Sequence, residues 1–462
     1  MPTGPAAYDS PRPRALSRQR RRAVDPARLA AFEVLKAVRV DDGYTNLLLP
    51  ATLARHGLTG RDAAFVTELA SGTIRRQGTY DAVLAACIDR PLRKVEAKVL
   101  DALRLGAHQL LAMRVPTHAA IDTTVTLVRE QVNQGAAGFS NAVLRKVASQ
   151  DLAAWLSQVA GDDLAVAHSH PAWVVDELRR ALGGRAEELP ALLAADNDAP
   201  RVTLVARPGL SARDELPGTP TPYSPYGVVL DGGDPAGIVA VAEGRAGVQD
   251  EGSQLVALAL ATAPVEGRDE RWVDLCAGPG GKASLLAALA SSRGAALTGV
   301  ELHHHRARLV ARAGAAAGSG LAGVVQADAT RAPFADASAD RILLDAPCTG
   351  LGALRRRPEA RWRRRPGDVT ELVTLQRALL TEAVRVLRPG GALLYATCSP
   401  VLAETASVVA ATLADHPEVR LDDVGAHLPA VPDAEGPLPG TVQLWPHRHG
   451  TDAMFLALLR KE

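Results

Sequence analysis

The sequence has few aromatic residues and few cysteines, carries almost no net charge and contains no long apolar run. Only 3% of its 462 residues are aromatic, and the formal net charge is +1. The four cysteines show no disulfide spacing, so a reducing, cytoplasmic location is expected. There is no secretory apolar segment and no run of the roughly 20 apolar residues that cross a bilayer, so no membrane association is expected. The cysteines are Cys87, Cys276, Cys348 and Cys398.

The chain is rich in apolar residues, and its basic residues are clustered. Hydrophobic residues make up 47% of the chain, enough for the cores of roughly two to four domains at this length. Residues 1–24 contain many arginines and prolines and predict a disordered basic tail, which either contacts RNA phosphates or is only solvated. A metal site is not expected, because the adjacent His303, His304 and His305 point in different directions around a helix.

A glycine-rich turn at residues 276–282, Cys-Ala-Gly-Pro-Gly-Gly-Lys, follows an apolar strand and precedes a helix. Glycine lets a ligand approach the backbone closely. Strand, turn and helix in this order are typical of the first unit of a doubly wound α/β sheet. The phosphate-loop pattern fails at Cys276 and Ala283, and the dinucleotide pattern fails because the glycines fall at 278, 280 and 281.

The two strands that follow both end in a carboxylate, at Glu301 and at Asp328. A carboxylate at the end of the second strand suits the paired hydroxyls of a ribose. The turn and the two acids together predict S-adenosyl-L-methionine, with its amino-acid part on the turn, its ribose on Glu301 and its adenine near Asp328. A purely structural turn with capping acids is the alternative. The predicted donor-binding residues are Cys276, Ala277, Gly278, Pro279, Gly280, Gly281, Lys282, Glu301, Asp328 and Asp345.

Two further apolar strands, 342–345 and 391–397, are each followed by a cysteine, Cys348 and Cys398. In a parallel sheet both thiols would lie at the edge that binds the ligand. A lone cysteine is more often packing than a nucleophile. Cytosine C5, however, is a poor nucleophile, and a thiolate that adds to C6 enables C5 to attack a methyl group. Two thiols beside a methyl donor therefore predict methylation of cytosine at C5. Glu404, shortly after the second cysteine, is expected to cap a helix.

These motifs resemble those of the RNA cytosine-C5 methyltransferases, in particular the bacterial Sun or RsmB group that acts on 16S ribosomal RNA. The resemblance runs from about residue 25 to the C-terminus and is sharpest at 276–282, 345–350 and 397–399. It implies that Cys398 attacks C6 and that Cys348 assists product release. It also implies that Asp345 lies near the donor and the cytosine edge around N3. At Ala453 and Met454 the chain departs from the Asp-Gly-Phe-Phe usual in the family.

Residues 25–150 have the apolar spacing of helices and predict an all-α bundle. Segments 103–111, 116–121 and 138–145 resemble the NusB-like domain of an antitermination factor, which implies that the bundle binds RNA or protein. A purely structural bundle is the alternative.

Residues 151–245 predict linker helices and a small α+β module that resembles an RNA-recognition fold, although the stacking aromatics of such folds are not evident. Residues 246–462 are expected to form the catalytic domain. The predicted fold class is therefore α/β, a Rossmann-like methyltransferase domain preceded by an all-α NusB-like bundle and a small α+β module.

Seven arginines surround Trp362 in residues 355–365, shortly after Pro347 and Cys348. Such a run is usually a solvated face, but positive charge beside an active site attracts phosphates. Trp362 either stacks on a base or anchors the segment, and we favour the anchor. The candidate RNA-binding residues are Arg355, Arg356, Arg357, Arg361, Arg363, Arg364 and Arg365.

The expected partner is 16S ribosomal RNA or the assembling small subunit, and a monomer is expected. A tRNA or another ribosomal site is an alternative substrate. An RNA-binding antitermination factor with an inactive methyltransferase domain is an alternative of another class, and the intact Asp345, Cys348 and Cys398 argue against it. A small-molecule methyltransferase would need neither the arginine segment nor two additional N-terminal domains.

Overall fold

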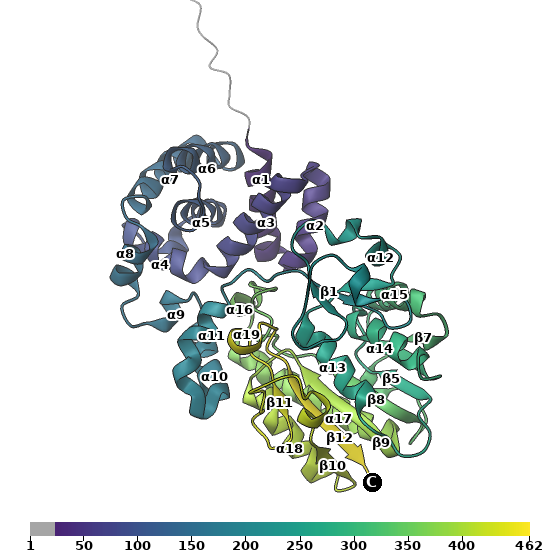
Figure 1. Ribbon diagram of the computed structural model, residues 1–462. Coiled ribbons are helices and arrows are strands. Elements are labelled where there is room, and N and C mark those ends of the chain that lie inside the picture. Colours follow the sequence, from purple (N-terminus) through teal and green to yellow (C-terminus); the bar gives the residue numbers. More distant parts are fainter. Residues whose placement is uncertain (1–23) are drawn as a thin grey trace, which may run out of the picture.

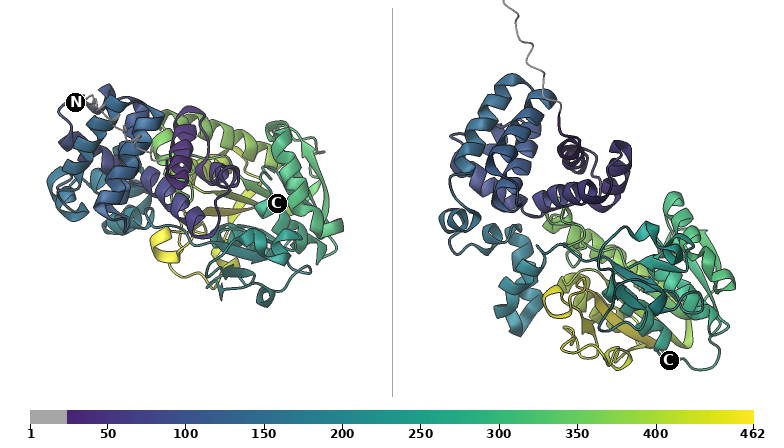
Figure 2. Two further views of the ribbon diagram at one scale, coloured as in Figure 1. Left: turned by 90° about the horizontal axis from the view of Figure 1, so that it is seen from above. Right: turned by 45° about the horizontal axis from the view of Figure 1, so that its top comes forward.

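The computed structural model describes residues 24–462, so the predicted basic tail lies outside the described residues except for Val24. A bundle of helices lies beside a larger domain built on a mixed sheet (Figure 1). Two further views show the same arrangement, with the bundle on one flank of the sheet domain (Figure 2). The chain therefore folds as an α-helical part followed by an α/β part.

The bundle begins where the sequence predicts, because the side chain of Asp25 accepts a hydrogen bond from the backbone N–H of Arg28 and Pro26 occupies the first turn. Its apolar faces form two buried clusters, one around Phe32 and Leu69 and one around Tyr80 and Leu103. The helices are α1 (Pro26–Val40), α2 (Thr45–His56), α3 (Gly60–Arg75), α4 (Gln77–Cys87), α5 (Ala97–Leu111), α6 (Thr117–Gln131) and α7 (Gln134–Val147).

Short helices and a small antiparallel sheet connect the bundle to the large sheet. The helices are α8 (Leu152–Val159), α9 (Leu164–Ala167), α10 (Ala172–Leu182) and α11 (Leu189–Ala195). The small sheet has the order β2-β3-β1-β4 and contains β1 (Thr203–Ala206), β2 (Thr219–Pro220), β3 (Gly227–Val229) and β4 (Ala246–Val248), with α12 (Val239–Ala242) beside β4. This α+β module agrees with the predicted fold class.

The large sheet is eight-stranded, with the order β10-β12-β9-β8-β5-β6-β7 and β11 paired to β12. Strands β5 to β9 are parallel, whereas at one side β12 pairs antiparallel with β9 and β10 pairs antiparallel with β12. The order reverses beside β5, which places a ligand crevice at the carboxyl ends of β5 and its neighbours. The strands are β5 (Arg271–Asp274), β6 (Ala296–Glu301), β7 (Leu321–Gln326), β8 (Ala339–Asp345), β9 (Leu387–Thr397), β10 (Val419–Asp422), β11 (Val442–Gln443) and β12 (Phe455–Lys461).

Helices cover both faces of this sheet, so its central strands are apolar on both sides. Along β8, Leu343 belongs to the core shared with α13 and α14, whereas Ile342 and Leu344 belong to the core shared with α17 and α18. This alternation confirms the predicted Rossmann-like α/β fold. The helices of this domain are α13 (Glu251–Thr262), α14 (Gly281–Ser291), α15 (His304–Gly314), α16 (Ala360–Arg363), α17 (Pro366–Val386), α18 (Ala406–Asp415) and α19 (Pro446–His449).

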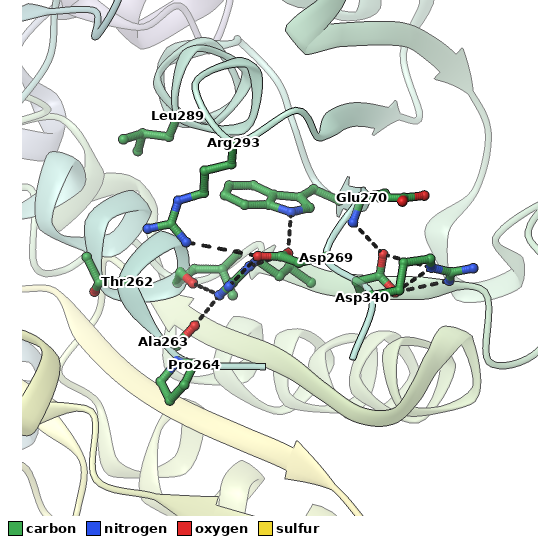
Figure 3. Close-up of polar contacts among 12 residues, drawn as sticks. Thr262, Ala263, Pro264, Asp269, Glu270, Leu289, Arg293 and Asp340 are labelled. Atoms are coloured by element: carbon green, nitrogen blue, oxygen red, sulfur yellow. Dashed lines mark hydrogen bonds and ion pairs between the residues drawn. The ribbon is translucent and has the colours of Figure 1, made fainter. Parts of the chain in front are cut away.

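Polar contacts of Asp269 and Asp340 fix the amino ends of β5 and β8 (Figure 3). The guanidinium of Arg341 donates two hydrogen bonds to the Asp269 carboxylate, at 2.8 and 2.7 Å. It also donates to the carbonyl oxygens of Leu260 and Ala263 at the end of α13, and it stacks over the ring of Trp272. The two strands whose far ends bear the predicted site are thereby locked to each other and to α13.

The arginine segment joins the bundle, the linker helices and the sheet domain. Arg361 is fully buried and donates to the carbonyl oxygens of Arg75, Ser169 and Asp196 and to the side chain of Asn197. The indole N–H of its neighbour Trp362 donates to the carbonyl oxygen of Ile74 at 2.7 Å. This contact agrees with the interpretation of that tryptophan as an anchor.

Replacing Arg361 should loosen the junction between the helical and sheet parts. Arg361→Ala leaves buried carbonyl oxygens unpaired, each at a cost of about 1–3 kcal/mol, so the free energy of unfolding should fall by about 3 kcal/mol or more. Urea denaturation followed by tryptophan fluorescence measures this change. Arg365→Ala, an exposed arginine of the same segment, should stay within about 0.5 kcal/mol of the parent. Equal midpoints for Arg361→Ala and the parent would contradict this role.

Candidate active site

The glycine-rich turn between β5 and α14 packs directly against the end of β6. Asp274 ends β5, and its carboxylate accepts a hydrogen bond from the backbone N–H of Cys276 at 3.2 Å. A Cβ added at Gly278 would lie 2.0 Å from a carboxylate oxygen of Glu301, so no larger residue fits there. Gly280 has φ +115° and its Cβ would press on α15. The structure therefore brings together the turn and Glu301, which the sequence assigned to one ligand.

Glu301 is buried and is oriented by the start of α15. One of its oxygens accepts a hydrogen bond from the backbone N–H of His303 at 2.9 Å, and Arg306 lies 3.5 Å from the other. Arg306 also donates to the carbonyl oxygen of Gly278 at 2.7 Å. It thus ties the acid to the turn, a role that the sequence did not predict because Arg306 is one of several arginines on its helix.

Asp328 lies at the surface beyond the end of β7. Its carboxylate accepts hydrogen bonds from the backbone N–H and the hydroxyl of Thr330, at 2.9 and 2.8 Å. These bonds lower the pKa of Asp328, which therefore stays charged at neutral pH. Its part in adenine binding stays a prediction.

Lys282, the last residue of the glycine-rich motif, reaches across to the end of β8. Its ammonium group donates to the Asp345 carboxylate at 2.8 Å. Burial, together with the nearby charge of Asp345, raises the pKa of Asp274 to about 7. Carboxylates from two adjacent strand ends therefore share one region, and Lys282 supplies the positive charge that compensates them.

The two predicted cysteines lie side by side at the ends of β8 and β9. Their sulfur atoms are 3.4 Å apart, and both residues are partly exposed. With the proton on Cys348, the hydrogen bond to Cys398 lowers the pKa of the Cys398 thiol, and the charges of Arg357 and Lys282 lower it further. The same contact, followed by burial, raises the pKa of Cys348. The environment thus separates one thiol that ionises readily from one that keeps its proton.

A buried carboxylate holds the two cysteine loops together. Glu404 accepts hydrogen bonds from the backbone N–H of Thr349 at 2.7 Å, from its hydroxyl at 2.5 Å and from the hydroxyl of Ser399 at 2.6 Å. Thr349 and Ser399 directly follow the two cysteines, and Gln376 also donates to Glu404 at 3.2 Å. The prediction of a helix cap at Glu404 is wrong, because α18 starts after Thr405 without a side-chain cap. The sequence feature that could have indicated its contact with the cysteine loops is its position, five residues after Ser399.

Most arginines of the segment after Cys348 are bound within the protein. Arg355 and Arg356 contact Asp452, and Arg356 also pairs with Asp250. Arg364 donates to the carbonyl oxygens of Cys348 and Thr349.

Other members of the segment differ in exposure. Arg363 donates to the carbonyl oxygen of Gly43. Arg361 is fully buried, so Arg361 has no surface on which a phosphate could bind. Arg357 and Arg365 are exposed. These two are the most exposed members of the segment, and contact between the segment and RNA stays a prediction.

Residues 24–462 offer neither a metal-binding cluster nor a membrane-spanning helix. No group of three or more histidine, cysteine, aspartate or glutamate side chains in this range could hold a metal ion. Over the same residues, no helix combines the length and the apolar character needed to cross a membrane.

Comparisons with known proteins agree with this geometry. A family model described as 16S rRNA methyltransferase RsmB/F matches residues 259–460, and the NusB family model matches residues 25–149. The chain is 50% identical to a putative methyltransferase of Mycobacterium tuberculosis strain H37Rv, covering 96% of this chain and 98% of that protein. It is 31% identical to the probable ribosomal RNA small subunit methyltransferase B of Bacillus subtilis, covering 94% and 98%. The crystal structure of PH0851 shares the fold, with 23% identity, a TM-score of 0.78 and coverage of 95% and 99%.

A Rossmann-like sheet with this turn and these strand ends, in a chain with these relatives, defines an S-adenosyl-L-methionine-dependent RNA methyltransferase. The chain belongs to the RsmB/F family of 16S rRNA methyltransferases and carries a NusB-family domain in front. The family, fold class and cofactor predicted from the sequence are confirmed. The residues also fit the cofactor, because Gly278 brings the bare backbone of the turn against the buried Glu301 carboxylate.

Glu404 should be required for turnover and not for donor binding. Glu404→Gln removes charge-assisted hydrogen bonds, each worth about 1.5–3 kcal/mol, and presents an N–H group to donors, so the cysteine loops should separate. We expect kcat for RNA methylation to fall at least tenfold while calorimetry finds unchanged affinity for S-adenosyl-L-methionine. Glu371→Gln, an exposed glutamate on α17, is the matched control and should keep full activity. A folded Glu404→Gln protein with normal kcat would rule out this positioning role.

Proposed function

We propose that this enzyme methylates C5 of a cytosine in 16S ribosomal RNA through a covalent bond between Cys398 and C6 of the base. The observation that carries the proposal is the pair of thiols 3.4 Å apart at the ends of β8 and β9, of which Cys398 has the lowered pKa. Enzymes that methylate an oxygen or an exocyclic nitrogen act on atoms that are already nucleophilic and need no thiolate. Carbon C5 needs activation by a nucleophile that adds to C6.

The first step belongs to Cys398. Its thiolate attacks C6 to form an S–C6 bond, and the electron pair of the C5–C6 double bond becomes available at C5. Lys282 holds Asp345 at 2.8 Å, and Asp345 would hydrogen-bond the base edge around N3 and orient the ring. S-adenosyl-L-methionine, when bound, supplies the methyl group as an electrophile.

The second step belongs to Cys348. Once Cys398 is alkylated it no longer accepts the hydrogen bond that raises the pKa of Cys348, so Cys348 can lose its proton to solvent. Its thiolate then takes the proton from C5. The electron pair of that C–H bond restores the C5–C6 double bond, and the S–C6 bond breaks to return Cys398 as a thiolate. Two cysteines are thus needed because one stays bonded to the base while the other removes the proton.

The donor is held by the turn and the strand-end acids. Residues 276–282 would contact the amino-acid part, Glu301 the ribose hydroxyls and Asp328 the adenine. Arg306 keeps Glu301 and the turn in register. We further propose that residues 25–150, 151–245 and 246–462 are the folding units, with the catalytic site confined to the last.

The two cysteines should fail differently when they are replaced. Cys398→Ala cannot form the S–C6 bond and should leave the RNA unmodified and unattached. Cys348→Ala can add to C6 and transfer the methyl group but cannot remove the C5 proton, so it should accumulate protein covalently joined to RNA. A denaturing gel shows this species as a slow band that nuclease removes. The double variant should give no band.

This test has two informative failures. A trapped species with Cys398→Ala in place of Cys348→Ala would exchange the two roles. Full methylation of 16S ribosomal RNA by both single variants, measured by bisulfite sequencing, would exclude the covalent mechanism.

Glu301 should determine affinity for the donor. Its loss removes charged hydrogen bonds to the ribose, each worth about 1.5–3 kcal/mol, so Glu301→Ala should weaken S-adenosyl-L-methionine binding at least tenfold in calorimetry. Glu270→Ala removes an exposed carboxylate at the opposite end of the sheet, just before β5, and should bind normally. Unchanged affinity in Glu301→Ala would refute the assignment.

A further inference from the structure

The helical bundle touches the rim of the active site through the short connection between α1 and α2. The hydroxyl of Thr45 donates to the Glu359 carboxylate at 2.7 Å, and both residues are almost fully buried. Arg363 donates to the carbonyl oxygen of Gly43 at 2.8 Å. These contacts fix the backbone on both sides of Tyr44 to the arginine segment that follows Cys348.

Tyr44 itself is not buried with its neighbours. Its residue is 43% exposed, in a chain with only six tyrosines. The guanidinium of Arg363 lies 4.9 Å from its ring centroid and that of Arg357 lies 5.9 Å away. The backbone on both sides of the ring is therefore fixed by hydrogen bonds, and the ring is partly open to solvent with two guanidinium groups over it.

The arginine segment links this aromatic side chain to the neighbourhood of the catalytic thiols. Arg357, which borders the ring, is near enough to Cys398 for its charge to act on that thiol. Arg364 of the same segment donates to the carbonyl oxygens of Cys348 and Thr349. One short segment of the chain, residues 355–365, therefore contacts both Tyr44 and the loop that carries Cys348.

We propose that Tyr44 is a stacking platform for a nucleobase that flanks the target cytosine, and that Arg357 binds the adjacent phosphate. Single-stranded RNA is recognised by bases stacked on aromatic rings and by cationic groups along the backbone. A cytosine that leaves the stack to reach the catalytic thiol also leaves its neighbour without a partner, and an exposed ring replaces that partner. The position of the target base rests on the proposed function.

The consequence is a composite RNA site. The helical bundle, joined to the catalytic domain by Thr45 and Glu359, contributes a base contact, and the catalytic domain contributes the chemistry. The bundle therefore acts in substrate recognition at the active site itself, besides any contact that its outer surface makes. Specificity for the flanking base is weak in this arrangement, because every base presents a π-face.

Binding of RNA by variants of the full-length chain tests this role. Tyr44→Leu keeps an apolar side chain without a π-face, and Tyr44→Phe keeps the ring. With fluorescently labelled unmodified 16S ribosomal RNA fragments and no methyl donor, Tyr44→Leu should bind about tenfold or more weakly and Tyr44→Phe within about twofold of the parent. Leu47→Ala is the matched control, since Leu47 is 67% exposed three residues further on, in the first turn of α2, and it should bind normally.

Photochemical cross-linking gives a second readout. RNA that contains 5-iodouridine, irradiated in the complex, should attach to the peptide that carries Tyr44. In Arg357→Gln the slope of log affinity against log salt should fall by about one, because one phosphate contact is lost. Affinity for S-adenosyl-L-methionine should be the same in all variants.

Equal RNA affinity of Tyr44→Leu and the parent, or cross-links confined to other peptides, would overturn the inference. Weaker donor binding in Tyr44→Leu would show that the ring only supports the fold, which also overturns it. Failure of the proposed function is separate: a parent enzyme that binds RNA through Tyr44 but does not methylate cytosine would refute the chemistry and leave the stacking site intact.

Discussion

The buried carboxylate of Glu404 is the constraint on which the catalytic geometry depends. Strands β8 and β9 are parallel neighbours, so their ends already lie close together, but the residues beyond them form separate loops. Glu404 accepts hydrogen bonds from Thr349 and Ser399, the residues directly after the two cysteines, and so draws both loops onto one anion. The sulfur atoms then meet at 3.4 Å. Without that anion, the loops would have no shared acceptor, and the separation of the two thiol pKa values would be lost.

The arginine segment shows that a run of like charge in the sequence does not by itself indicate whether its residues bind a ligand or stabilise the fold. Arg361 is fully buried as a bond between the helical and sheet parts, Arg364 supports the carbonyl oxygen of Cys348, and Arg356 pairs with Asp250 and Asp452. The segment therefore works mainly as internal structure. Because it contacts the bundle on one side and the cysteine loop on the other, the position of the helical domain and the geometry of the thiols are set by the same residues.

Local patterns made the turn, the strand-end acids and the two cysteines predictable. Each is a few residues long and follows an apolar strand, and the parallel sheet then brings the strand ends together without further information. The features that could not be predicted depend on contacts across the chain. Thr45 and Glu359 are 314 residues apart, and Glu404 meets Thr349 across 55 residues. Arg306 shows no pattern that sets it apart from its neighbours on α15. Such partners are chosen by the tertiary fold, which a one-dimensional pattern does not contain.

The central physical claim is that the fold makes Cys398 the thiolate and keeps the proton on Cys348. Peptide-resolved mass spectrometry after a short pulse of limiting iodoacetamide measures this directly, because only the thiolate reacts. A lowered pKa means that the thiolate fraction of Cys398 rises at lower pH than that of Cys348. Between pH 6 and about 9 we therefore expect carbamidomethylation of Cys398 to exceed that of Cys348, and we expect Glu404→Gln to shrink the difference. Equal rates for the two cysteines, or faster reaction at Cys348, would contradict the account.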